Sequence, residues 1–146
     1  MKKLLIVSYW IGIITDAVAT VLLFSPSIGN AALQPQPFEL SPMYFYVSRV
    51  AGALMLGWTV LLFWAQRRPV ERADILMLTL FPVVTILAGA AVLVARSEQI
   101  ALSNLAPMFI LYVMVFCLYI PSYLWAKKQI KYKEERIWEA KVSKKR

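Results

Sequence analysis

Asp16 is the residue with the clearest chemical significance, because its carboxyl group lies within the long apolar run 4–24. Inserting an ionisable side chain into a membrane-length helix costs about 2.5–3.5 kcal/mol, and such a residue marks a functional-site hypothesis. Ser8, Gly12 and Thr20 lie at four-residue spacing with it, so a helix would place all four residues on one small, polar face. We therefore expect Asp16 to face the protein interior rather than lipid.

Arg49 is the predicted partner of Asp16. In a helix it would lie about 9 Å from the outer end of the second apolar run, while Asp16 would lie about 12 Å from the outer end of the first. Two adjacent antiparallel helices would bring these side chains to nearly the same depth. An ion pair there would neutralise both charges within the bilayer.

Two hydroxyl residues extend this predicted site, because Thr85 in the third apolar run and Tyr112 in the fourth fall at compatible depths. The candidate intramembrane polar site thus comprises Asp16, Arg49, Thr85 and Tyr112. Two interpretations remain open: a water-lined or ligand-holding pocket, and a structural ion pair that fixes the register of the helices.

The composition excludes several other kinds of site. The chain has no His and one Cys, Cys117, which excludes an intramolecular disulfide, a Cys/His zinc site, bis-His haem and any triad that needs an imidazole. It also lacks a phosphate-binding glycine loop. We therefore assign no catalytic residue, no metal ligand and no cofactor, and a non-enzymatic role is expected more than an enzymatic one.

The elements that must position these residues follow from hydropathy. The 146 residues are 60% hydrophobic and 16% charged, whereas soluble domains are about 45–50% apolar and about 25% charged. A bilayer core about 30 Å thick needs about 20 apolar residues per helix. Four runs meet that length, at 4–24, 43–65, 75–94 and 106–125. We predict an all-α polytopic membrane protein, with an antiparallel four-helix bundle over 1–125 and a basic juxtamembrane tail over 126–146.

The positions of the positive residues predict the orientation of the bundle. Lys and Arg precede the first run, separate the second from the third, and fill the tail, whereas 25–42 contains neither and 95–105 contains only Arg96. Because Lys and Arg mark cytoplasmic loops, both termini are expected in the cytoplasm. The run 4–24 is interpreted as a retained helix and not a cleaved signal, because Asp16 interrupts it. The expected location is a prokaryotic cell membrane.

The tail predicts a contact with lipid. Its apolar residues Ile130, Ile137 and Trp138 could form a stripe on a helix lying along the inner leaflet. The basic residues expected to contact anionic headgroups are Lys127, Lys128, Lys131 and Lys133. Nucleic acid is not expected as a partner, because the tail lies against the membrane and lacks a nucleic-acid-binding fold.

The arrangement of four spans resembles a loose group of DoxX-like small bacterial membrane proteins. The shared features are Pro26 just after the first helix and an Arg followed by small residues opening the second, here Arg49, Gly52 and Gly57. The resemblance covers the bundle but not the tail. It implies a small bacterial membrane protein, in a group with some members linked to quinone-associated sulfur oxidation. It transfers no catalytic residue, since Asp16 is outside the shared features.

Three functions are consistent with these features. The first is an accessory or assembly subunit that holds partners or anionic lipid, in a homo-oligomer or a larger membrane complex. The second is a homo-oligomeric small transporter in which Asp16 alternates between Arg49 and a substrate or proton. The third is an enzyme or binder for an apolar small molecule such as a lipid or quinone, with Asp16 as base and Tyr112 as hydrogen-bond donor.

Overall fold

The chain is helical throughout the part that the structure describes. The computed structural model describes residues 1–25, 27–29, 41–96 and 102–143, and no strand occurs in these segments. Four helical segments are long and apolar enough to cross a membrane: Lys2–Phe24, Pro42–Gln66, Asp74–Arg96 and Ser103–Ser143. The predicted all-α class and its four apolar helices are thereby confirmed.

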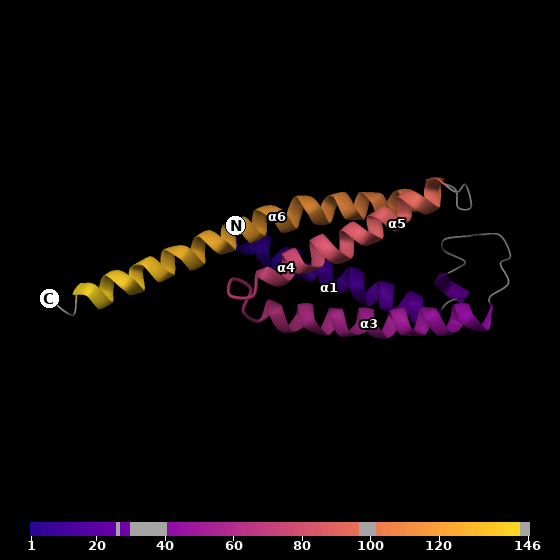
Figure 1. Ribbon diagram of the computed structural model, residues 1–146, viewed down its shortest axis with the longest axis horizontal. Helices are drawn as coiled ribbons and strands as arrows, with labels where there is room; N and C mark the ends of the chain where they lie inside the picture. Colours follow the sequence, from indigo (N-terminus) through magenta and orange to yellow (C-terminus); the bar gives the residue numbers. More distant parts are fainter. Residues whose placement is uncertain (26, 30–40, 97–101, 144–146) are drawn as a thin grey trace.

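Two of these segments are single helices that lie side by side in opposite directions, α1 (Lys2–Phe24) and α3 (Pro42–Gln66) (Figure 1). The start of α3 is encoded locally: the Ser41 hydroxyl accepts a hydrogen bond from the Tyr44 amide (3.2 Å), and Pro42 occupies the first turn. The small residue Gly52 lets α3 approach the end of α1, where an added Cβ would lie 3.3 Å from Leu23.

The third apolar segment is not one regular helix. It consists of α4 (Asp74–Leu78), the π-helix η1 (Thr79–Val84) and α5 (Thr85–Arg96). Pro82 lies inside η1. A proline has no amide hydrogen and displaces the carbonyl of the preceding turn, so it disturbs the regular α-helical hydrogen bonding. The Thr85 hydroxyl donates to the Leu80 carbonyl oxygen (3.0 Å).

The fourth segment is α6 (Leu102–Ser143), a helix of 42 residues that passes through the bundle and continues beyond it (Figure 1). We predicted instead a tail helix lying along the membrane surface. Residues 126–143 contain neither Gly nor Pro, and good helix formers such as Lys, Glu and Ala dominate there. The helix therefore has no break at which it could turn, and it projects from the bundle in line with the apolar segment.

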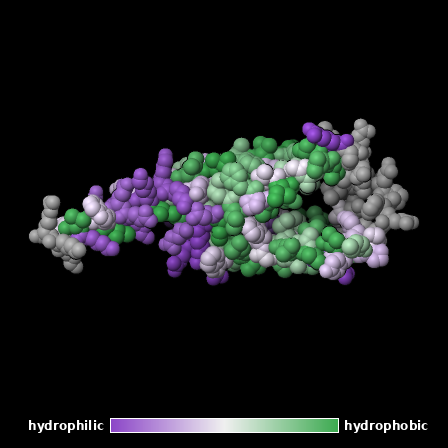
Figure 2. Space-filling view, viewed as in Figure 1, coloured by the Kyte–Doolittle hydropathy of each residue, from purple (hydrophilic) through white to green (hydrophobic). Residues whose placement is uncertain are grey.

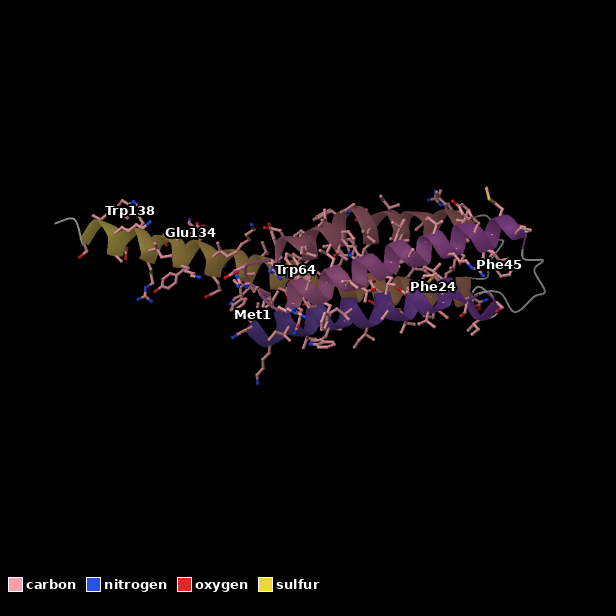
Figure 3. All side chains as sticks on the ribbon, turned by 90° about the horizontal axis from the view of Figure 1, so that it is seen from below. Met1, Phe24, Phe45, Trp64, Glu134 and Trp138 are labelled. Carbon is pink, nitrogen blue, oxygen red and sulfur yellow. The ribbon has the colours of Figure 1, made fainter. Side chains whose placement is uncertain are left out.

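The bundle has two unlike ends. Figure 3 places Met1 and Trp64 at the end from which α6 projects, and Phe24 and Phe45 at the other. The first end is named the basic end, since Lys2, Arg67 and Lys127 lie there, and the second is named the far end. Hydrophilic atoms gather at the basic end and over the projecting part of α6, while apolar atoms cover most of the visible face of the bundle (Figure 2).

The core is packed most closely toward the basic end. Its large, fully buried side chains are Leu5, Tyr9, Leu62, Leu76, Leu80 and Tyr119. Several polar groups there are paired: the Tyr9 hydroxyl donates to the Arg72 carbonyl oxygen (2.8 Å). The hydroxyls of Ser8 and Ser122 bond to each other (2.9 Å). The Arg72 guanidinium stacks on the Trp64 ring, 3.3 Å from its centroid. These contacts fix α1 against α6 and against the connection between α3 and α4.

Candidate ligand cavity

A cavity of about 310 Å³ opens where this close packing ends. It lies between α1, α3, the η1 and α5 segments, and α6, and its volume is at the lower limit of ligand pockets, about 300–1,000 Å³. Most of its wall is aliphatic. The lining residues are Gly12, Thr15, Asp16, Ala19, Leu22, Leu23, Met55, Thr79, Val83, Val84, Leu87, Met108, Leu111, Tyr112, Val115 and Tyr119.

Asp16 is the one ionisable carboxyl among these lining residues, which confirms that it faces the interior of the bundle. Its side chain is partly buried, and its buried Oδ2 atom has no hydrogen-bond partner among the residues that the structure describes. The buried Tyr119 hydroxyl likewise has none within this part of the chain. Buried polar atoms are nearly always hydrogen-bonded, so each such atom calls for an explanation, for example a group that the protein does not itself supply.

A glycine in α1, Gly12, leaves the space that the Tyr119 side chain occupies. The hydroxyl of Tyr119 lies against Gly12, where any Cβ would collide with that oxygen. Leu62 of α3 also packs against Gly12, at 3.2 Å from the Cβ position. The helices α1, α3 and α6 therefore approach one another closely at Gly12, about one helical turn before Asp16.

The hydroxyls of the two threonines on the cavity wall already have hydrogen-bond partners within the protein. The Thr15 hydroxyl donates to the Ile11 carbonyl oxygen (2.8 Å). The Thr79 hydroxyl donates to the Ile75 carbonyl oxygen (2.8 Å) and accepts from the Trp58 indole nitrogen (3.1 Å). The polar groups that remain for a ligand are therefore Asp16 and the tyrosines.

Two members of the predicted site meet at this cavity and two do not. Asp16 and Tyr112 both line it, from α1 and α6. Tyr112 also packs edge-on against Phe109, with ring centroids 6.4 Å apart. Thr85 is exposed on the outer face of the third segment, where it bonds to its own helix. Thr79, six residues earlier, supplies the hydroxyl on the cavity wall instead.

Arg49 forms no ion pair with Asp16 in the structure. The ion pairs among the described residues join Arg68 to Glu71, Lys127 to Asp74, and Lys131 to Glu135. Arg49 is exposed on α3. The prediction of this pair was wrong.

The offset between α1 and α3 explains the missing pair. Ser48, next to Arg49, donates to the Leu23 carbonyl oxygen (2.7 Å), so this part of α3 lies beside the last turn of α1. Asp16 precedes Leu23 by seven residues, or about 10 Å along the axis. The depth argument assumed that both helices end at the same level, whereas α3 extends past α1 at the far end.

Tyr119 and Thr79 were missed as site residues. Tyr119 lies seven residues after Tyr112, which is two helical turns, and this spacing predicts that both rings lie on one face of the helix, although only Tyr112 was included in the predicted site. Thr79 lies six residues before Thr85, so the two side chains point to different sides of a helix, and the prediction chose Thr85.

The predicted lipid-contacting lysines follow the bundle on α6. The Lys127 ammonium lies 2.9 Å from an Asp74 carboxylate oxygen, and this hydrogen-bonded contact raises the pKa of Lys127. Lys131 pairs with Glu135 at 4.0 Å. Lys128 and Lys133 are exposed. Within the described residues, no group of three or more His, Cys, Asp or Glu side chains could hold a metal ion.

Comparison of the chain with protein-family models, with curated proteins and with solved structures finds no match.

Proposed function

We propose that this chain is a four-span protein of a prokaryotic cell membrane that binds a small, mainly apolar molecule inside its helical bundle. The cavity at Asp16 carries this proposal. Lys2, Arg67 and Lys127 share one end of the bundle, which supports a cytoplasmic location for both termini.

The composition of the cavity wall favours ligand binding over a purely structural role. A structural Asp would be expected to find a partner inside the protein, yet its Oδ2 atom has none among the described residues. The aliphatic wall loses dispersion contacts wherever nothing fills the space. An apolar molecule would restore those contacts, and its polar group would meet the carboxyl.

Native mass spectrometry after gentle extraction from the membrane tests the proposal. The wild-type protein is expected to retain a small molecule of defined mass. Ala19 lines the cavity, so Ala19→Phe should fill part of it and remove that mass. Ala53→Phe is the matched control, because Ala53 is exposed on the surface of α3. Equal retention by both variants, or no retained molecule in the wild type, would contradict the proposal.

A role as an accessory or assembly subunit is the second candidate. Its support is the projecting part of α6, whose side chains from Lys131 to Ser143 are exposed. Lys127, Lys128, Lys131 and Lys133 lie where this helix leaves the bundle and are the proposed contacts for anionic headgroups. In the same spectra, a second protein at fixed stoichiometry that is lost when the chain ends at Lys128 would favour this role.

The transporter hypothesis loses its main support. It required Asp16 to alternate between Arg49 and a substrate or proton, and the two side chains lie at different levels of the bundle. We do not carry it forward.

A further inference from the structure

We propose that the cavity selects a lipophilic monoamine, with its ammonium group against the Asp16 carboxylate and its hydrocarbon part against the aliphatic wall. This inference rests on the proposed function, because it names the class of molecule that the same cavity binds. The new element is the charge and the hydrogen-bonding capacity of the ligand's polar head group.

The charge argument begins with what the lining lacks. No Lys or Arg is among the residues that line the cavity. The partner predicted from the sequence, Arg49, lies beside the end of α1, about 10 Å along the axis from Asp16. A carboxylate in a low-dielectric site needs a counter-ion. A bound ammonium would supply the positive charge that the described part of the chain does not place there.

The tyrosines suit the same head. Tyr112 and Tyr119 both line the cavity from one face of α6, and aromatic faces attract cations. The Tyr119 hydroxyl has no partner among the described residues, and a hydroxyl oxygen can accept a hydrogen bond from an N–H donor. Met55 and Met108 add flexible, polarisable side chains that adapt to varied hydrocarbon shapes.

The same lining disfavours other heads. A carboxylate or phosphate would face Asp16 with no basic side chain on the wall to offset the repulsion. A zwitterionic phospholipid head contains a phosphate, which Asp16 would repel and no basic side chain on the wall would bind, and it also has a larger volume. A neutral alcohol could accept or donate a hydrogen bond, but it would leave the charge of Asp16 uncompensated. The lining therefore ranks an amine first, an alcohol second and an acid last.

Three probes with similar hydrocarbon chains and different polar head groups test this ranking. Radiolabelled decylamine, decanol and decanoate are bound to the full-length protein in zwitterionic nanodiscs near neutral pH, where the amine is protonated and the acid ionised. Binding to empty nanodiscs is subtracted. We expect decylamine to bind about thirtyfold or more tightly than decanol, as for a buried charge pair against a neutral partner, and decanoate to bind least.

Two isosteric variants assign the preference to one carboxyl. Asp16→Asn should lower the affinity for decylamine to about that for decanol, and change the affinity for decanol by about twofold or less. Asp74→Asn is the matched control, since Asp74 is exposed at the basic end and pairs with Lys127. It removes the same charge and should leave all three affinities unchanged.

The outcomes separate this inference from the proposed function. Equal binding of decylamine and decanol by the wild type, or an amine preference that persists in Asp16→Asn, would overturn the inference and leave an apolar ligand site in place. Failure of all three probes to bind would overturn both. If Asp16→Asn does not fold, the comparison of the three heads on the wild type still decides the ranking.

Discussion

Tyr119 and Gly12 depend on each other, because the Tyr119 hydroxyl occupies the space that a side chain at Gly12 would need. Burial of this oxygen without a partner is unfavourable. Tyr119 therefore belongs both to the packed core and to the wall of the cavity.

Gly12→Ala is expected to lower the free energy of unfolding by about 1–3 kcal/mol, the usual range for overpacking a core. Thermal unfolding in nanodiscs, followed by circular dichroism, measures the change. Gly57→Ala is the control, since nothing lies within 4 Å of the Cβ position at Gly57. There the better helix propensity of Ala should leave the stability equal or higher by about 0.5–1 kcal/mol.

A double variant tests whether the hydroxyl is the cause. Gly12→Ala combined with Tyr119→Phe removes the atom that the new Cβ would meet. We expect this pair to regain part of the lost stability, so that the two changes are not additive. Strict additivity would show that the cost of Gly12→Ala arises elsewhere, for example at Leu62.

At the scale of elements, the helices could be predicted from the length and composition of the apolar runs. Each apolar run is helical, the third with the π-helix η1 within it, and the predicted 43–65 and observed Pro42–Gln66 differ by a residue at each end. The offset between α1 and α3 could not be obtained in the same way. It is set by contacts such as Ser48 with the Leu23 carbonyl, and it places Arg49 at a different level from Asp16.

The π-helix η1 is the second element that hydropathy could not reveal. The wider turn of a π-helix rotates the residues that follow it relative to the residues that precede it. Thr79 and Val83 of η1 line the cavity, while Thr85, which follows it, is exposed. Residues within η1 thus belong to the cavity wall, which agrees with the frequent occurrence of π-helical turns at functional sites.

Pro82→Ala is expected to let this segment adopt a regular α-helix, because the substitution restores an amide hydrogen and removes the ring. Stability should be unchanged or higher, since proline in a helix interior costs about 3 kcal/mol. Rotation of Thr79 and Val83 should weaken decylamine binding about tenfold or more, as for a displaced contact in a preformed pocket. Unchanged affinity would mean that η1 does not shape the site.

At the scale of the whole molecule, most of the bundle's side surface is apolar. In the four membrane-length segments, between 22% and 33% of the most apolar window is buried inside the protein, so lipid or further protein must cover the remainder. Cys117 belongs to this exposed apolar surface of α6. The sequence could predict this surface from hydropathy, but it could not predict the cavity, which depends on how the helices cross.

The proposed topology predicts a pattern of chemical labelling. In a Cys117→Ala background, Ser143→Cys and Arg67→Cys should react with a membrane-impermeant maleimide only in inside-out vesicles. Met43→Cys, which is exposed at the far end, should react only in intact cells. Labelling of Ser143→Cys in intact cells would reverse the orientation. Labelling of Ser143→Cys and Arg67→Cys from opposite sides would contradict the four-span arrangement.

The continuity of α6 gives the molecule a lever arm. The same helix carries Tyr119 at the cavity and Ser143 in the projecting part, about 36 Å apart along its axis, with Pro121 just after Tyr119. If the arm moves as a rigid body, a tilt of about 5° at the cavity displaces its C-terminal end by about 3 Å. A ligand that tilted α6 at the cavity would thereby move the charged side chains of its projecting part.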